Sequence, residues 1–407
     1  MSVRRAPYWL DRFPRTRRPA HSRITGEHTT RVVIVGGGLT GCACAWSFAA
    51  AGVPVVVLEA DRLGAGATAG SLGLVREDFD ASFQTTAASH GLRAARALWR
   101  QLRRASLDFS AAVRRLDLRC DHAPLDLLHL ANRLPQESAR LRREYQARRA
   151  AGLEHTWITP AAVTRQTSVE SGGAIRTRGA GLDPYRACLG FASAAAGRGA
   201  VVYERSPVRR IRFTRRHVDV LTAAATVRAE AVVVTTAAAS PGVRALHRHL
   251  RPEQGYAVLT ESLPAAVRRE LGNRAAALRD AAAPPHFLRW LKDDRVLFAG
   301  ADQRPVASRA LDKVLIQRTG QLMYELSTMY PAISGAEPEW SWAYTYEGTV
   351  DGLPFIGTHR NFPHHLFALG QGRHGAAVSW LAARLLLRQF LGEAAKGDEL
   401  FGFGRIL

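Results

Sequence analysis

The sequence predicts an α/β fold in which a parallel sheet carries a binding site and a second domain adjoins it. The first observation is a β-branched run from Val32, followed by a glycine turn and an alanine-rich helix from about Leu39 to Ala51. The second is the apolar strand "VPVVVLE" directly after that helix. Strand, helix and strand in this order form a βαβ unit, whose two strands lie parallel. The third is the length of 407 residues, which is enough for two domains.

The composition excludes several classes of protein. Hydrophobic residues make up 47% and charged residues 22%, which is typical of a globular chain. No apolar run is long enough to cross a bilayer, and the basic N-terminal arm, residues 1–30, lacks the apolar segment of a secretory signal. The four cysteines are scattered without metal-ligand spacing. We therefore expect a cytoplasmic protein with no metal site.

The net charge of +21 raises the question of a nucleic-acid partner. Only three of the 56 basic residues are lysines, namely Lys292, Lys313 and Lys396. The arginines are spread along the chain without interleaved aromatic residues, which indicates compositional bias and not a nucleic-acid surface. We expect no nucleic-acid partner, and peripheral contact with an acidic membrane stays open.

A glycine pattern follows the first predicted strand. Gly36-x-Gly38-x-x-Gly41 permits a tight turn, a close approach of backbone to a pyrophosphate, and close packing of helix on strand. Glu59 lies 18 positions after Gly41, at the end of the second strand, where a carboxylate binds ribose hydroxyls. The same carboxylate would repel a 2′-phosphate. The pattern predicts a dinucleotide site that disfavours NADP.

Further segments extend this organisation. Residues 84–150 are mostly helical in pattern, with a strand at "APLDLLHLA". A helix is predicted near Asp312–Tyr330. A strand ending in Gly370 precedes a final helix from about Gly375 to Phe390. In the N-terminal arm, "PYWLDRFP" is predicted to pack an aromatic anchor onto the surface of the domain.

Several of these stretches resemble one family. "RLGAGATAGSLGLV" is similar to the segment beneath the flavin in FAD-dependent oxidoreductases of the D-amino acid oxidase superfamily, which includes glycine oxidase, sarcosine oxidase and gamma-glutamylputrescine oxidase. Other blocks of that family match "GAGLDPYRACLGFASAAAGRGAVVYERSPVRRI", "WAYTYEGTVDGLPFIG" and "LGQGRHGAAVSWLAARLL". "AEAVVVTTAAAS" also matches, with Ala237 where the family has glycine. The blocks occur in the family's order from Val32 to about Arg388.

The resemblance implies a Rossmann-like FAD-binding domain of the GR2 type plus an α+β substrate domain with an antiparallel sheet. The implied FAD-binding domain is discontinuous, with residues 31–90, 181–240 and 338–407, and the substrate domain comprises 91–180 and 241–337. Some relatives attach flavin covalently through a histidine in the segment that matches "GATAGSLG" or through a cysteine near the last glycine turn. This chain has no histidine in the first segment and no cysteine near the second, so we expect non-covalent FAD. The implied cofactor-binding positions are Gly36, Gly38, Leu39, Thr40, Gly41, Glu59, Ala60, Thr68, Ser71, Leu72, Val208, Gly370, Gln371, Gly372, Arg373, His374 and Gly375.

The resemblance also points to a substrate site. A carboxylate-binding arginine of glycine oxidase aligns with Tyr346, which cannot make a two-bond pair with an acid, whereas a second family arginine matches Arg373. We therefore expect a larger amine, an N-substituted amino acid or a substrate with a remote acid. Glu347 could pair with an ammonium group. His374 is a candidate for proton transfer, with a turn histidine bonded to backbone as the alternative. Trp342, Tyr344 and Arg289 are further candidates around the substrate.

The expected reaction is oxidation of a carbon–nitrogen bond by hydride transfer to flavin N5, giving an imine that hydrolyses. Molecular oxygen and a quinone or other electron-transfer acceptor both stay open, as does the oligomeric state. Two alternatives are a flavin dehydrogenase of a 2-hydroxy acid and a non-catalytic FAD-binding subunit of a larger complex.

Overall fold

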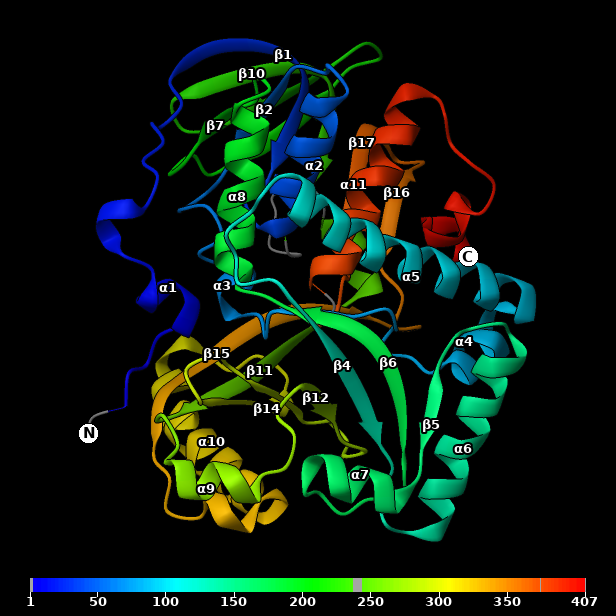
Figure 1. Ribbon diagram of the computed structural model, residues 1–407. Helices are drawn as coiled ribbons and strands as arrows, with labels where there is room; N and C mark the ends of the chain where they lie inside the picture. Colours follow the sequence, from blue (N-terminus) through cyan, green and yellow to red (C-terminus); the bar gives the residue numbers. More distant parts are fainter. Residues whose placement is uncertain (1–2, 237–243, 374, 407) are drawn as a thin grey trace.

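Two sheets organise the protein. The computed structural model describes residues 3–236, 244–373 and 375–406 (Figure 1). In this part of the chain, the first sheet has eight strands and the second has nine. The first sheet lies in the upper half of Figure 1 and the second in the lower half, and the chain passes between them several times.

The first sheet has a parallel centre, ordered β16-β17-β10-β1-β2-β7. All these strands run parallel to their neighbours except β16, and β8 and β9 extend β10 as an antiparallel meander. Residues Val32–Val35 are buried, as expected for a strand covered on both faces. The strands are β1 (Gly26–Val35), β2 (Val55–Leu58), β7 (Val201–Tyr203), β8 (Arg210–Phe213), β9 (Val218–Leu221), β10 (Ala225–Val234), β16 (Phe355–His359) and β17 (Phe362–Leu369).

Helices cover one face of this sheet. Helix α2 (Leu39–Ala50) packs between α8 (Pro184–Ala196) and α11 (Gly375–Leu391) (Figure 1). Its alanines and glycine let both neighbours approach closely, and almost the whole helix is buried. Helix α5 (Leu92–Arg115) then crosses over α11. The predicted βαβ unit is confirmed as β1-α2-β2.

The second sheet is mostly antiparallel, in the order β15-β11-β14-β13-β12-β4-β6-β3, with β5 paired to β6. One pair, β12 with β4, is parallel. The strands are β3 (Leu74–Val75), β4 (Ala123–Leu130), β5 (Thr156–Ile158), β6 (Ala174–Gly181), β11 (Leu250–Thr260), β12 (Ala276–Arg279), β13 (Phe287–Trp290), β14 (Val296–Gln303) and β15 (Pro338–Thr349).

Helix α10 (Ser308–Met329) packs against β11, β14 and β15 of this sheet. Its buried leucines, Leu315, Leu322 and Leu326, recur at spacings that place them on one face of a helix. The remaining helices are α1 (Tyr8–Arg12), α3 (Ala67–Gly70), α4 (Phe83–His90), α6 (Pro135–Ala150), α7 (Pro160–Thr167) and α9 (Ala265–Glu270).

The division of the chain between the sheets differs from the predicted one. We expected residues 338–407 to belong wholly to the FAD-binding domain, but β15 pairs along its length with β11 in the second sheet. We expected residues 91–180 in the substrate domain, but α5 shares the core of the first sheet's helices, with Trp99 and Phe109 both buried. Backbone pairing and core contacts decide these boundaries, and composition does not report either.

The N-terminal arm binds the rest of the protein through aromatic residues. Trp9 is 5% exposed, and its indole Nε1 donates to the carbonyl of Ser71 at 2.8 Å. The ring of Tyr8 meets that of Trp340 edge to face, with centroids 5.1 Å apart. The predicted aromatic anchor is therefore present. Over the described ranges, no helix has the length and apolar character needed to cross a membrane, and no cluster of three or more His, Cys, Asp or Glu residues could hold a metal ion.

Candidate active site

A cavity of about 420 Å³ lies where the carboxyl ends of β1, β2 and β10 meet β15 of the second sheet. The carboxyl ends of parallel strands are where ligands bind in open α/β sheets. The N-termini of α2 and α11 and the segment that holds α3 complete the wall. The lining residues are Gly36, Gly38, Leu39, Thr40, Glu59, Gly64, Gly66, Ala67, Thr68, Ser71, Leu72, Pro184, Thr235, Thr236, Tyr344, Thr345, Tyr346, Glu347, Ala368, Leu369, Gly370, Gln371, Gly372, Arg373, Gly375 and Ser379.

The glycine turn of this cavity has no room for side chains. A Cβ at Gly41 would lie 1.8 Å from the carbonyl oxygen of Gly36, which itself has a φ of +107°. A Cβ at Gly38 would lie 3.2 Å from the hydroxyl of Thr68 and would also project from the cavity wall. The turn thus brings backbone N–H groups and the start of α2 up to the cavity. This arrangement suits a phosphate group, because N–H groups and the helix dipole both attract negative charge.

Glu59 lies across this turn at the end of β2. Its Oε2 accepts a hydrogen bond from the amide of Gly37 at 2.6 Å, and Oε1 accepts one from Asp61 at 2.9 Å. Burial raises the pKa of Glu59, although these backbone N–H groups oppose the rise. A carboxylate has further acceptor capacity, which suits the hydroxyls of a ribose. It also ties the strand end to the turn.

A second glycine turn faces the first one. Gly370 and Gly372 have φ values of +65° and +61°, a conformation in which L side chains are strained. The Thr40 hydroxyl of α2 lies 2.8 Å from Oε1 of Gln371 and 2.8 Å from Oγ of Ser379 on α11. The two helix N-termini therefore meet at the cavity.

The cavity meets the requirements of a dinucleotide cofactor. Two glycine turns, two helix N-termini and one carboxylate supply the backbone and acid groups that such a cofactor needs. Thr236, two residues beyond the end of β10, lines the cavity with a buried hydroxyl that has no partner among the described residues. An unpaired buried hydroxyl in a cavity wall is consistent with a ligand that would satisfy it.

Most residues predicted to bind the cofactor line this cavity, but three of the described ones, Gly41, Ala60 and Val208, do not. Gly41 lies behind the turn, where its lack of a side chain allows the close contact with Gly36. Ala60 is exposed just beyond the end of β2. Val208 is buried in the core on the face of the first sheet opposite to helices α2, α8 and α11. His374 lies outside the described residues.

Arg373 is paired inside the protein. Its Nε donates to Oδ2 of Asp302 at 2.8 Å, Nη2 donates to the same oxygen, and its guanidinium carbon lies 4.9 Å from the centre of the Tyr346 ring. The hydroxyl of Tyr346 donates to that oxygen as well. Burial lowers the pKa of Arg373, but the carboxylates of Asp80 and Asp302 outweigh it and hold the pKa above its usual value.

Asp302 was not predicted as a site residue. It follows the apolar strand segment "RVLFAGA", and an acidic residue at the end of a buried strand is the signal that could have identified it. Its side chain is 2% exposed, and its Oδ1 has no partner among the described residues. Burial and the nearby Asp302 carboxylate raise the pKa of Tyr346 well above its usual value, so the phenol keeps its proton.

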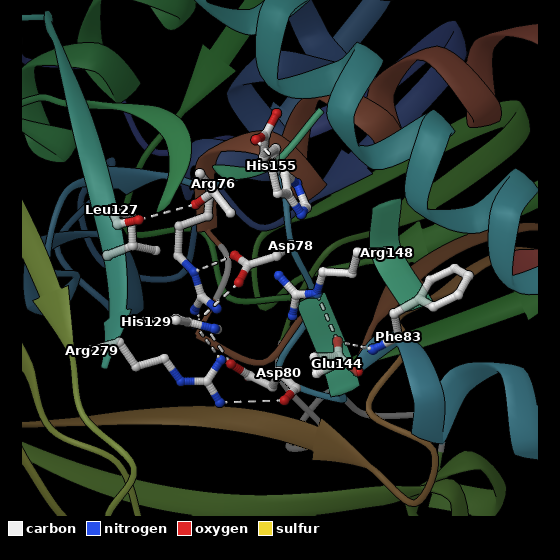
Figure 2. Close-up of polar contacts among 12 residues, drawn as sticks. Arg76, Asp78, Asp80, Phe83, Leu127, His129, Glu144, Arg148, His155 and Arg279 are labelled. Atoms are coloured by element: carbon white, nitrogen blue, oxygen red, sulfur yellow. Dashed lines mark hydrogen bonds and ion pairs between the residues drawn. The ribbon is translucent and has the colours of Figure 1, made fainter. Parts of the chain in front are cut away.

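Asp80 belongs to a charged network that includes Arg76 and Asp78 (Figure 2). Oδ2 of Asp80 accepts the backbone N–H of Arg373 at 3.4 Å, and Oδ1 accepts Nη1 of Arg76 at 3.3 Å. Arg76 also donates through Nε to Asp78 at 3.0 Å. Burial disfavours the charge of Asp78, but Arg76 and other nearby cations lower its pKa far below the usual range. The network thus anchors the second glycine turn.

The second sheet contributes Arg279 and His129 to the same network, as Figure 2 shows. Burial, reinforced by Arg279, lowers the pKa of His129 well below its usual value, so this imidazole is neutral. Its Nε2 lies 2.9 Å from Nη1 of Arg279 and accepts that hydrogen bond. The same Nε2 lies 3.2 Å from Oδ2 of Asp78, but because the imidazole is neutral this contact is not an ion pair. Burial lowers the pKa of Arg279 to about 10, which leaves it charged at neutral pH.

The other predicted substrate residues separate into two groups. Tyr344, Tyr346 and Glu347 line the cavity, and the carbonyl of Glu347 accepts the N–H of Gly372 at 2.7 Å. Trp342 is buried behind them and donates its indole N–H to Gly70.

Arg289 lies outside the cavity wall, contrary to expectation. Its Nη1 donates to three carbonyls, those of Leu72 at 2.9 Å, Gly73 at 2.6 Å and Leu182 at 3.0 Å. These bonds explain why a buried arginine is tolerated here, although burial lowers its pKa to about 10. Arg289 therefore braces the segment that carries Ser71 and Leu72.

Comparison with known proteins gives a family for this architecture. Residues 31–389 match the family described as FAD dependent oxidoreductase (DAO). The chain is 26% identical over 398 residues to a probable oxidoreductase, OrdL, of Haemophilus influenzae, covering 94% of this chain and 89% of the relative. It is 26% identical over 375 residues to the gamma-glutamylputrescine oxidoreductase of Escherichia coli, covering 91% and 85%.

Solved structures show the same fold. The glycine oxidase of Geobacillus kaustophilus superimposes with a TM-score of 0.74 and 22% identity, covering 92% of this chain and 98% of that one. The L-proline dehydrogenase of P. horikoshii has a TM-score of 0.74 and 19% identity, with 92% and 97% covered. Sequence identities this low support the shared fold alone.

Proposed function

The chain belongs to the family of FAD-dependent oxidoreductases, and we propose that it oxidises the carbon–nitrogen bond of an amine or an N-substituted amino acid. The observation that carries this proposal is the charge around the cavity. Beside the second glycine turn, Arg373 is paired with Asp302, while Glu347 adds a further carboxylate to the wall. Because Asp302 already engages Arg373 and the hydrogen of the Tyr346 hydroxyl, the wall favours a substrate with a positive or hydrogen-bond-donating nitrogen. The relative from Escherichia coli is named for gamma-glutamylputrescine, which is an amine.

The proposal assigns the cofactor to the two glycine turns. Gly36, Gly38 and the first turn of α2 would hold the pyrophosphate, and Glu59 would hold the ribose. Gly370–Gly372 and the N-terminus of α11 would face the flavin. When bound, FAD supplies the two-electron acceptor that takes hydride from the carbon next to the nitrogen, and the imine product hydrolyses in water.

The side chains then bind and orient the amine. Glu347 would attract the nitrogen, and the rings of Tyr344 and Tyr346, whose centroids are 6.0 Å apart, would form an aromatic wall that excludes water. Positioning of the carbon–hydrogen bond is the main task of this wall. An amine that arrives deprotonated needs no side-chain base, so the proposal assigns no residue to proton abstraction.

The test is an anaerobic titration of the purified protein followed by visible absorbance. We expect a bound-flavin spectrum that bleaches with one member of a panel of primary amines, N-alkyl amines and N-alkyl amino acids. Bleaching by 2-hydroxy acids alone would replace the proposal with a hydroxy-acid dehydrogenase. If no compound bleaches the flavin, a non-catalytic FAD-binding subunit would be favoured. Readmission of air then distinguishes an oxidase, which recolours at once, from a dehydrogenase.

Acid precipitation of the same protein tests how the flavin is held. We expect all yellow colour to stay in the supernatant and the pellet to be colourless, because the sequence has no histidine in "GATAGSLG" and no cysteine near the last glycine turn. A yellow pellet would contradict the prediction of non-covalent FAD.

A further inference from the structure

We infer that Asp302 determines the substrate class in two ways. It prevents Arg373 from binding a substrate carboxylate, and it leaves the Tyr346 hydroxyl able only to accept a hydrogen bond from an amine. This inference rests on the proposed function and narrows it to amines that carry no acid group at this position. Asp302 does not line the cavity. It acts through Arg373 and Tyr346, which do, and is therefore a specificity-determining residue and not a catalytic one.

The first step concerns the guanidinium of Arg373. An arginine captures a carboxylate best through two parallel N–H groups. Here Nε and Nη2 both donate to Oδ2 of Asp302, so two donors of the fork are already engaged by an internal acid. The guanidinium also stacks on the Tyr346 ring, which limits its reorientation. A substrate carboxylate would have to displace Asp302 and leave it buried without a counter-ion.

The second step concerns the hydroxyl of Tyr346. A tyrosine hydroxyl has one hydrogen, and in Tyr346 that hydrogen points to Asp302. The oxygen can therefore only accept a hydrogen bond from a molecule in the cavity. An amine or ammonium N–H meets this requirement, and a carboxylate oxygen does not.

The third step concerns charge. Asp302 offsets the positive charge of Arg373, and its buried Oδ1 has no partner among the described residues. Glu347 lines the cavity on the same strand as Tyr346. On this side of the cavity the positive charge of Arg373 is thus already balanced, and the Tyr346 hydroxyl oxygen is an acceptor. An unpaired acid brought to this place would meet repulsion, whereas a cation would be attracted.

The experiment measures binding of two probes with the same flat shape and opposite charge, benzoate and benzamidine, to the holoenzyme by isothermal titration calorimetry. Neither probe has an oxidisable carbon–hydrogen bond next to nitrogen, so the readout does not depend on turnover. We expect the wild-type protein to bind benzamidine at least tenfold more tightly than benzoate. We expect Asp302→Asn and Asp302→Ala to reverse this order, with benzoate affinity rising at least tenfold, because Arg373 is released.

Two controls assign the change to this contact. Asp398→Asn removes a buried partner of a different arginine, Arg388, whose Nη2 lies 2.6 Å from Asp398, and should leave both affinities unchanged. Adding Arg373→Met to Asp302→Asn should abolish the gain in benzoate affinity. Flavin content and melting temperature show whether each variant folds.

Several outcomes would overturn the inference. Benzoate binding at least as tight as benzamidine binding in the wild-type protein is one, and it requires no variant at all. An unchanged preference in folded Asp302 variants is another. Oxidation of amines with an unchanged probe preference would refute this inference and leave the proposed function standing. A reversed preference without amine oxidation would do the opposite.

Discussion

Two parts of the same cavity are built by different physical means. The first glycine turn comes from one short stretch of chain, and backbone sterics determine its shape. A Cβ at Gly41 would lie only 1.8 Å from the carbonyl oxygen of Gly36. The Arg373 cluster joins Asp302, Tyr346 and Asp80 from distant segments, and charge holds it together. We therefore expect that even an alanine side chain destabilises the first glycine turn, whereas the Arg373 cluster tolerates isosteric substitutions that keep its charges balanced.

The largest effect is expected at Gly41. Gly41→Ala should lower the free energy of unfolding by at least about 3 kcal/mol and abolish FAD retention, because the new Cβ meets the carbonyl of Gly36. Gly320→Ala is the matched control, since Gly320 also lies in a helix but has open space around it. Alanine there should stabilise the protein by up to about 1 kcal/mol. Denaturant titration and flavin absorbance measure both quantities.

Normal flavin content in Gly41→Ala would break the comparison, since it would show that the turn can relax. Destabilisation by Gly320→Ala would instead point to a general intolerance of helix substitutions in this protein.

The next effect concerns Arg373. Arg373→Met should cost about 3–5 kcal/mol of unfolding free energy, because it leaves the Asp302 carboxylate buried without a counter-ion. Arg133→Met, which breaks a pair whose side chains are 70% and 63% exposed, should cost less than about 1 kcal/mol. The double variant Asp302→Asn, Arg373→Met should recover part of the loss. An additive double variant in urea unfolding would show that the two side chains do not act as a pair.

A smaller effect is expected at Glu59. Glu59→Gln should raise the dissociation constant of FAD about tenfold, or about 1.4 kcal/mol, because an amide replaces one of the two acceptor oxygens that meet the Gly37 and Asp61 amides. Glu230→Gln, on the exposed part of β10, is the control and should leave FAD affinity unchanged. Fluorescence titration of the apoprotein with FAD provides the values. Equal affinity in wild type and Glu59→Gln would remove Glu59 from the cofactor site.

The smallest effect is a pH dependence from the same residue. Burial raises the folded-state pKa of Glu59, so the folded apoprotein binds this proton more tightly than the unfolded chain does. The contribution of Glu59 to stability is therefore fully present below its unfolded pKa and is lost as pH rises through the folded value. As pH rises through this range, the free energy of unfolding of the wild-type apoprotein should fall relative to that of Glu59→Gln. Above the folded-state pKa the difference should become constant. The opposite slope in urea unfolding at several pH values would mean that the backbone N–H groups dominate over burial.

Residues that the sequence predicts to share a site lie together where their interactions are local. Gly36, Gly38 and Glu59 line the cavity because strand, turn and helix lie within one βαβ unit, whose geometry follows from short-range sterics. Tyr346, Glu347 and Arg373 also line it, as the resemblance to a known family implied.

The prediction failed where the partner of a side chain lies far away in the chain. Arg289 was expected at the substrate, but its guanidinium finds three backbone carbonyls, one of them 107 residues away. Residues 338–349 were expected in the FAD-binding domain, but strand pairing with β11 places them in the second sheet.

The sequence alone determined the glycine turn, because the contact that excludes a side chain at Gly41 involves Gly36, a residue only five positions away. Only the tertiary structure decided what Arg373 can bind. Its partners Asp302 and Asp80 lie 71 and 293 positions away, and the pairing of the two sheets brings them together. A charged side chain has no fixed partner in the sequence, because Coulomb attraction depends on distance in space and on burial.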